Sequence, residues 1–255
     1  MDLPKRFEEL PTSEQERVRR AGDQMGRYAF QHCAAVLVAP PPNCGPGRIN
    51  NGSAFILRLD SRYYLGTAWH VVQAWQLRTA AGERLLFQVG HADLPPTGRL
   101  VWHDEVGDIA FLMVDEFDVQ RIGIMPCESV LGWPPPKPAP GERLLFAGYP
   151  GSLREHGDDG VMDFGSFTGL VSATSVRDRY VVAQFQREHL ISNDGRELPP
   201  VGADLGGMSG GPVFLVKNLV YPLAGIITQH NSEFELMQIS TLDHVPPAFE
   251  PSHAA

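Results

Sequence analysis

A serine embedded in glycines is the strongest candidate for a nucleophile in this chain. Residues 206–214 read Gly-Gly-Met-Ser-Gly-Gly-Pro-Val-Phe, with the serine at position 209. The glycines leave room for an approaching substrate and allow the backbone N–H groups of Gly207 and Ser209 to converge on one point. Two such donors are what an acyl-transfer reaction needs to hold the oxyanion of its tetrahedral intermediate. The alternative is a glycine-rich turn without chemistry, because glycine clusters are common in turns.

A serine nucleophile also needs a base, and a carboxylate that orients the base. His70 follows two strand-like segments, and Asp108 directly precedes the apolar run 109–114. Each residue alone has a structural interpretation, since a lone histidine at a strand end is usually structural and Gly-Asp is an ordinary turn pair. All three contexts occur together in the order His, Asp, Ser, and this conjunction favours a triad of His70, Asp108 and Ser209.

The three segments together resemble the chymotrypsin/trypsin-like serine peptidases. Thr67-Ala68-Trp69-His70 is similar to the histidine motif, Asp108-Ile109-Ala110 to the aspartate motif, and residues 207–212 to the nucleophile motif. The resemblance covers roughly residues 33–245. It implies an all-β fold of two six-stranded barrels and a serine endopeptidase that acts on proteins or peptides. Val71 stands where animal digestive members usually carry a cysteine, so the bacterial and viral branch of the family is the nearer one.

The resemblance also implies a specificity pocket, and here the chain departs from the family pattern. Met208 replaces the aspartate that captures a freed N-terminus in zymogen-type members, so that activation switch cannot operate. His230 replaces a glycine at the pocket mouth, which puts ordinary tryptic cleavage in doubt. Ala203 stands at the pocket base in place of an acid, although Asp204 lies beside it. We expect small or aliphatic P1 residues.

Two more residues receive roles from the resemblance. Thr228 matches the serine or threonine that hydrogen-bonds the triad aspartate, and an ordinary strand threonine is the equal alternative. Gln229 and His230 would begin the edge strand that pairs with the substrate backbone.

Short apolar runs separated by turn signals predict a barrel or sandwich around these residues. A helix is expected from residue 12 to about residue 33, with Ser13 and Glu16 at capping-box spacing and Val18, Ala21, Met25 and Tyr28 facing the outside of a barrel. Strands are expected at 34–38, 54–59, 63–65, 85–89, 100–102, 109–114, 143–147, 169–172, 180–185, 212–215, 223–228 and 235–240.

Residues 131–141 contain five prolines, which cannot donate to a sheet ladder and favour an extended connection. We therefore predict an interdomain linker there. The expected organisation is a helical extension at 1–32, a first barrel with His70 and Asp108 at 33–130, the linker at 131–141, a second barrel with Ser209 at 142–245, and a tail at 246–255.

Composition limits the other functions. The 255 residues include 30 acidic and 21 basic side chains, a net charge of -9 that disfavours nucleic acid and anionic membranes as partners. Three cysteines, Cys33, Cys44 and Cys127, argue against a disulfide framework. Residues 1–20 lack the apolar run of a signal peptide, and we expect a cytoplasmic protein. No metal-binding or phosphate-binding motif is present, and the reaction needs no cofactor.

Two other functions remain open. Residues 207–211 also fit the Gly-x-Ser-x-Gly elbow of esterases, but a strand-like run follows where a helix is expected. The second alternative is a catalytically silent binding or sensor module with an intact triad. A further hypothesis is that a regulatory protein partner orders residues 186–204, because Asn193-Asp194-Gly195 is a turn-forming run.

Overall fold

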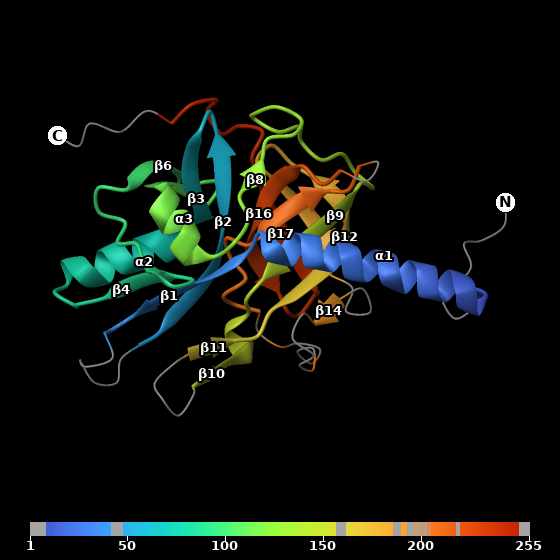
Figure 1. The fold of residues 1–255 in the computed structure, drawn as a ribbon, viewed down its shortest axis with the longest axis horizontal. Coiled ribbons are helices and arrows are strands. Elements are labelled where there is room, and N and C mark those ends of the chain that lie inside the picture. The colour runs from blue at the N-terminus through green and yellow to red at the C-terminus, as the bar shows by residue number, and fades with distance from the viewer. Residues whose placement is uncertain are drawn as a thin grey trace.

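The computed structural model describes residues 9–41, 48–156, 162–185, 190–192, 197, 200, 203, 205–217 and 220–249. These residues form two large β-sheets that follow one another along the chain and one small two-stranded sheet, with a long N-terminal helix lying across the second large sheet (Figure 1). The prediction of a mainly β protein with an N-terminal helix is confirmed. No helix among these residues has both the length and the hydropathy needed to cross a bilayer.

The first sheet has eight strands and carries the histidine and aspartate motifs. Its strand order is β5-β4-β1-β2-β3-β7-β6, and β8 runs parallel to β2. The strands are β1 (Ala34–Ala39), β2 (Asn50–Leu59), β3 (Arg62–Ala68), β4 (Leu86–Val89), β5 (Ala92–Asp93), β6 (Leu100–Asp104), β7 (Ile109–Val114) and β8 (Cys127–Glu128).

The prediction of a closed six-stranded barrel is wrong for this first sheet. Among the described residues no pairing joins its edge strands β5 and β6, so the sheet stays open as a half-barrel. Helix α2 (Trp69–Ala80) explains the difference, because its residues Trp69, Val71, Val72 and Trp75 are buried in the core of this sheet. Helix α2 therefore covers the apolar face of the first sheet, which additional strands would cover in a closed barrel.

The second sheet closes on itself. Its order is β13-β17-β16-β15-β9-β12-β14, and an additional pairing of β13 with β12 closes six of these strands into a ring. The six-stranded barrel is therefore confirmed for this half. The strands are β9 (Arg143–Gly148), β12 (Phe167–Val176), β13 (Tyr180–Gln184), β14 (Leu190–Ser192), β15 (Pro212–Leu215), β16 (Leu223–Asn231) and β17 (Leu236–Thr241), with the separate hairpin β10 (Arg154–His156) and β11 (Met162–Phe164) after the 3-10 turn η3 (Gly151–Leu153).

Helix α1 (Thr12–Gln31) packs against the outside of the second sheet at β9 and β12 (Figure 1). The packing uses only its C-terminal part, where Gly26 and Ala29 are buried, while Val18 is 47% exposed. The predicted capping box at Ser13 and Glu16 is wrong. Pro11 occupies the N-cap position, where its carbonyl accepts from Glu14 N and Gln15 N at 2.8 and 3.0 Å.

Two helices were not predicted. Helix α2 begins directly after β3, so His70 is the second residue of a helix rather than a strand end. Helix α3 (Glu116–Ile122) begins with a capping box between Asp115 and Asp118 and ends at Gly123, whose φ of 80° suits glycine.

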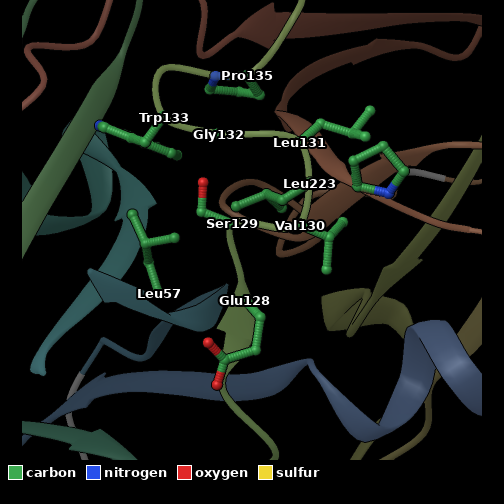
Figure 2. A pocket seen from close by; sticks show the side chains of 10 residues that line it. Leu57, Glu128, Ser129, Val130, Leu131, Gly132, Trp133, Pro135 and Leu223 are labelled. Carbon is green, nitrogen blue, oxygen red and sulfur yellow. The ribbon is translucent and has the colours of Figure 1, made fainter. Parts of the chain in front are cut away.

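The proline-rich segment packs between the two sheets. Leu131, Trp133 and Pro135 line a cavity of about 10 Å³ together with Leu57 of β2 and Leu223 of β16 (Figure 2). The Trp133 ring also meets Phe111 edge-on, and its Nε1 donates to Pro246 O at 2.9 Å. Trp133 therefore anchors the segment on the core that both sheets share, while Leu131 is exposed. The domain boundaries drawn on either side of it stay a prediction.

Candidate active site

His70 and Asp108 meet where β3 ends and β7 begins. These strands are antiparallel, and Ala68 at the end of β3 lies opposite Ile109 at the start of β7. Trp69 therefore lies beside Asp108, and His70 is the next residue. Asp108 Oδ2 lies 2.7 Å from His70 Nδ1, and Oδ1 accepts the His70 backbone N–H at 2.8 Å. The Asp108 carbonyl accepts from Trp69 N at 3.1 Å. The aspartate therefore holds both the backbone and the ring of the histidine.

This contact determines which ring nitrogen is free to act as a base. In the neutral imidazole, the tautomer that donates from Nδ1 to the Asp108 carboxylate leaves Nε2 with a lone pair. The His70 side chain is 51% exposed and the Asp108 side chain 22% exposed. Asp108 thus orients the imidazole through Nδ1, while much of the His70 side chain is exposed to solvent.

The glycine-rich segment before β15 is held by hydrogen bonds to its carbonyl groups. Gly206 O accepts from Gly151 N at 2.6 Å, and Met208 O accepts from Gly211 N at 2.9 Å. Ser53 of β2 holds the other two, donating its Oγ to Gly207 O at 2.9 Å and its N–H to Ser209 O at 2.8 Å. Four consecutive peptide groups are therefore held in one orientation.

Two N–H groups in this segment remain available. Met208 N and Gly210 N donate to Leu205 O and Ile227 O. In contrast, the described residues provide no acceptor for the N–H of Gly207 or Ser209. Both donors belong to peptides whose carbonyl groups are bonded on the opposite side, so they are pre-oriented for an incoming anion.

Position 207 requires glycine. Its φ is 102°, a region that other residues rarely adopt, and a Cβ there would lie 2.0 Å from Asn51 Nδ2. Asn51 Nδ2 donates to Tyr149 O at 3.1 Å, so the close neighbour is itself held in place. The backbone conformation at Gly207 is therefore specified by the glycine and by its packing against β2.

Ser209 lies near the histidine segment but is not bonded to it. A Cβ on the adjacent Gly210 would lie 2.5 Å from Thr67 Oγ1 and 2.8 Å from Ala68 N, two residues before His70. Ser209 Oγ donates to Thr228 O at 3.1 Å. Within the part of the chain that the structure describes, the His70–Asp108 pair is formed, and the serine hydroxyl points to an acceptor other than His70.

The predicted hydrogen bond from Thr228 to Asp108 is not formed. The Thr228 hydroxyl is buried, where it donates to Gln238 O at 3.4 Å and lies 3.4 Å from Ser240 Oγ. A register shift between Ile227 and Gln229 explains this, because it leaves Thr228 without an opposite residue on β17. At this bulge the Thr228 carbonyl accepts from Ser209 Oγ, and the Thr228 hydroxyl lies beside Ser240 of β17.

The predicted pocket residues have different surroundings. Met208 is 1% exposed and packs in the core of the second barrel. Gln229 and His230 pair with Gln238 and Met237 of β17 on one side, and their place on an edge that pairs with a substrate stays a prediction. The pairing of β16 with β15 ends at Ile226, and beyond it Ile227 O accepts from Gly210 N at 2.7 Å and Ile227 N donates to Gly211 O at 2.9 Å.

The other residues predicted to form the pocket are His230, Ala203 and Asp204. The His230 ring meets Phe185 edge-on at 5.1 Å between ring centroids. Ala203 is half-buried, with its N–H donating to Pro200 O at 3.0 Å. Asp204 lies outside the described residues, as does most of the segment 186–204 for which a regulatory partner was predicted.

The structure also identifies what the sequence did not reveal. Ser53 is fully buried in β2, and its Oγ accepts from Tyr149 N at 3.0 Å in addition to holding the glycine segment. A serine directly before the apolar run 54–57 of a central strand was the available signal. The motif around Ser209 does not form the elbow of the α/β-hydrolase esterases, because it leads into strand β15 rather than into a helix. Within the described residues, no three histidine, cysteine or acidic side chains gather as a set of metal ligands.

No family model matches this sequence, and no curated protein matches it. Solved structures with a similar fold include a thermostable serine protease, AL20, from an extremophilic microorganism, at 15% identity and a TM-score of 0.47 over 84% of this chain and 93% of that chain. A mutant of the Tobacco Etch Virus protease has 12% identity and a TM-score of 0.46 over 83% of this chain and 73% of that one. The protease Anisep from Arthrobacter nicotinovorans has 14% identity and a TM-score of 0.44 over 83% and 90%. Likenesses of this degree carry no functional inference.

Proposed function

We propose that this chain is a chymotrypsin-like serine endopeptidase in which Ser209 is the nucleophile, His70 the general base and Asp108 the residue that orients the base. One observation carries the proposal. The segment that presents Ser209 has its carbonyl groups bonded to protein, while the N–H groups of Gly207 and Ser209 have no acceptor among the described residues. Such a donor pair beside a serine is the arrangement that acyl transfer requires.

The reaction begins when the Ser209 hydroxyl turns from Thr228 O toward Nε2 of His70. His70 takes the proton as Oγ attacks the scissile carbonyl, and Asp108 stabilises the imidazolium through Nδ1. The N–H groups of Gly207 and Ser209 hold the oxyanion. His70 then gives the proton to the leaving amine, and water hydrolyses the acyl-enzyme by the same steps in reverse.

The proposed substrate is an unfolded peptide segment with a small or aliphatic P1 side chain. Ala203 brings no charge to the base of the pocket, and the His230 ring against Phe185 narrows its mouth. The backbone of Gln229 and His230, which lies beyond the end of the β15 pairing at Ile226, is the proposed place for substrate pairing.

Labelling with a fluorophosphonate probe tests the proposal. We expect the purified protein to be labelled at Ser209, and Ser209→Ala and His70→Ala to abolish labelling. His91→Ala is the matched control, because this histidine is exposed on the same sheet and has no proposed role. Labelling that survives His70→Ala would contradict the assigned base.

A silent binding module is the second candidate, and the bond from Ser209 Oγ to Thr228 O favours it. A serine kept on that acceptor would not react. Absence of labelling in the wild-type protein, together with a folded state shown by cooperative thermal unfolding, would support this candidate and reject the peptidase.

A further inference from the structure

A second carboxylate lies at the base of the turn that carries Asp108. Asp104 is the last residue of β6, and its side chain is 11% exposed. Its Oδ1 accepts from Val106 N at 3.1 Å, and the Gly107 N–H also donates to this carboxylate. A Cβ on Gly107 would lie 2.6 Å from Asp104 Oδ2. The carboxylate thus supports the turn up to the residue before Asp108.

The other partners of Asp104 come from the second sheet. Its Oδ2 accepts from the Arg179 guanidinium and lies 3.0 Å from Nε2 of His244. Arg179 lies in the turn between β12 and β13, and its carbonyl accepts from Thr241 N, at the end of β17, at 3.0 Å. His244 follows β17 by three residues. We call Asp104, Arg179 and His244 the Asp104 cluster.

The charges in the Asp104 cluster favour an ion pair that persists at neutral pH. Burial acts to raise the pKa of Asp104, but the Gly107 N–H, the His244 hydrogen bond and the Arg179 charge together hold it below its ordinary value. Asp104 is therefore ionised at neutral pH. A nearly buried carboxylate that accepts from several donors binds its partners more strongly than an exposed ion pair does.

We propose that Asp104 is a positioning residue which, through Arg179 and His244, keeps Asp108 and His70 of the first sheet in register with Ser209 of the second. This rests on the proposed function. The base and the nucleophile belong to different sheets, so proton transfer depends on how the two sheets are placed. Asp108 also has a φ of 53°, a conformation that must be maintained by surrounding contacts. The Asp104 cluster supplies such contacts directly beside it.

The rate of Ser209 labelling as a function of fluorophosphonate concentration tests the role. For Asp104→Ala we expect the maximal rate to fall about 10- to 100-fold, because small misplacements of reacting groups have effects of that size. The half-saturating probe concentration should stay unchanged. Arg179→Ala, at a more exposed residue, should lower the rate by a smaller factor, and Arg179→Lys should restore part of it.

Asp118→Ala is the matched control. Asp118 is also a nearly buried carboxylate of the first sheet region, 2.6 Å from the guanidinium of Arg99, and it contacts none of the three proposed catalytic residues. If Asp118→Ala and Asp104→Ala lower the rate equally, or if neither Asp104→Ala nor Arg179→Ala lowers it, the positioning role is rejected.

A second readout separates failure of this inference from failure of the proposed function. The Nδ1 proton of His70, bonded to Asp108 at 2.7 Å, should give a downfield proton resonance that His70→Ala removes. We expect Arg179→Ala and Asp104→Ala to broaden or shift this resonance and Asp118→Ala to leave it. Absence of labelling in the wild type would reject the peptidase alone, whereas an unchanged resonance in both cluster variants would reject the positioning role.

Discussion

Ser53 joins the first sheet to the segment that presents Ser209. Its hydroxyl bonds both Gly207 O and Tyr149 N, and Ser53 is fully buried. Ser53→Ala leaves the buried Gly207 carbonyl and the part-buried Tyr149 N–H without this partner, so we expect a loss of about 1–3 kcal/mol in the free energy of unfolding. The Gly207 peptide also becomes free to rotate, and we expect slower labelling of Ser209. Chemical denaturation and labelling rates measure the two effects.

Thr168→Val provides the comparison for Ser53→Ala. The Thr168 hydroxyl is buried in β12 and has no hydrogen-bond partner among the described atoms. Replacing it with a methyl group of similar shape should not destabilise the protein. If Ser53→Ala also leaves both stability and labelling unchanged, the hydrogen bonds of Ser53 do not hold the segment.

The residue scale also shows what the sequence could reveal about the site. The motifs predicted the contact of Asp108 with His70, and that contact is present. The bond predicted for Thr228 failed because a bulge in β16 depends on how two strands pair, which local sequence does not encode. Ser53 was missed because its role depends on a segment far away in the chain. The catalytic roles themselves stay a proposal.

At the scale of elements, strands were easier to predict than helices. Alternating or continuous apolar runs such as Ile109–Val114 predicted the central strands correctly. Helix α2 was missed because it has no side-chain cap and contains Trp69, Val71 and Val72, which are not strong helix formers. Burial against the first sheet stabilises it, and that is tertiary information. Helix α3 has a local signal, the capping box at Asp115, which was not used.

Helix α1 provides a prediction at this scale. Only its C-terminal part packs on the second sheet, so its two ends should respond differently to substitution. Ala29 is fully buried, and Ala29→Asp should lower the free energy of unfolding by about 3 kcal/mol or more because it buries an unpaired charge. Val18 is 47% exposed, and Val18→Asp should change the free energy of unfolding by less than about 1 kcal/mol. Urea denaturation of both variants measures this, and equal losses would contradict the packing of α1.

At the scale of the whole molecule, the two sheets share one apolar core. Phe55 and Phe111 of the first sheet lie in the same buried cluster as Phe214 and Ile226 of the second, and Ala29 of α1 joins them. The sequence predicted two barrels of equal kind because the family pattern has two. Closure of a barrel depends on pairing between strands far apart in the chain, so the open first sheet was not predictable from local patterns.

His32 lies where α1 enters this shared core, and it makes stability depend on pH. Burial lowers its pKa below the ordinary value, although the hydrogen bond to Met125 O at 2.8 Å acts in the opposite direction. The folded state therefore binds a proton at His32 less readily than the unfolded state. As the pH falls below about 6.5, the unfolded chain takes up this proton first, and the folded state loses stability.

We therefore expect the free energy of unfolding to decrease between pH 7 and pH 5, and His32→Asn to weaken this decrease. Asparagine places its side-chain N–H where Nδ1 of histidine lies, so it can keep the bond to Met125 O while removing the titration. His91→Asn, at an exposed histidine, should retain the wild-type slope. Urea denaturation at several pH values compares the three proteins. Equal slopes for the wild type and His32→Asn would show that protonation of His32 does not oppose the packing of the C-terminal end of α1.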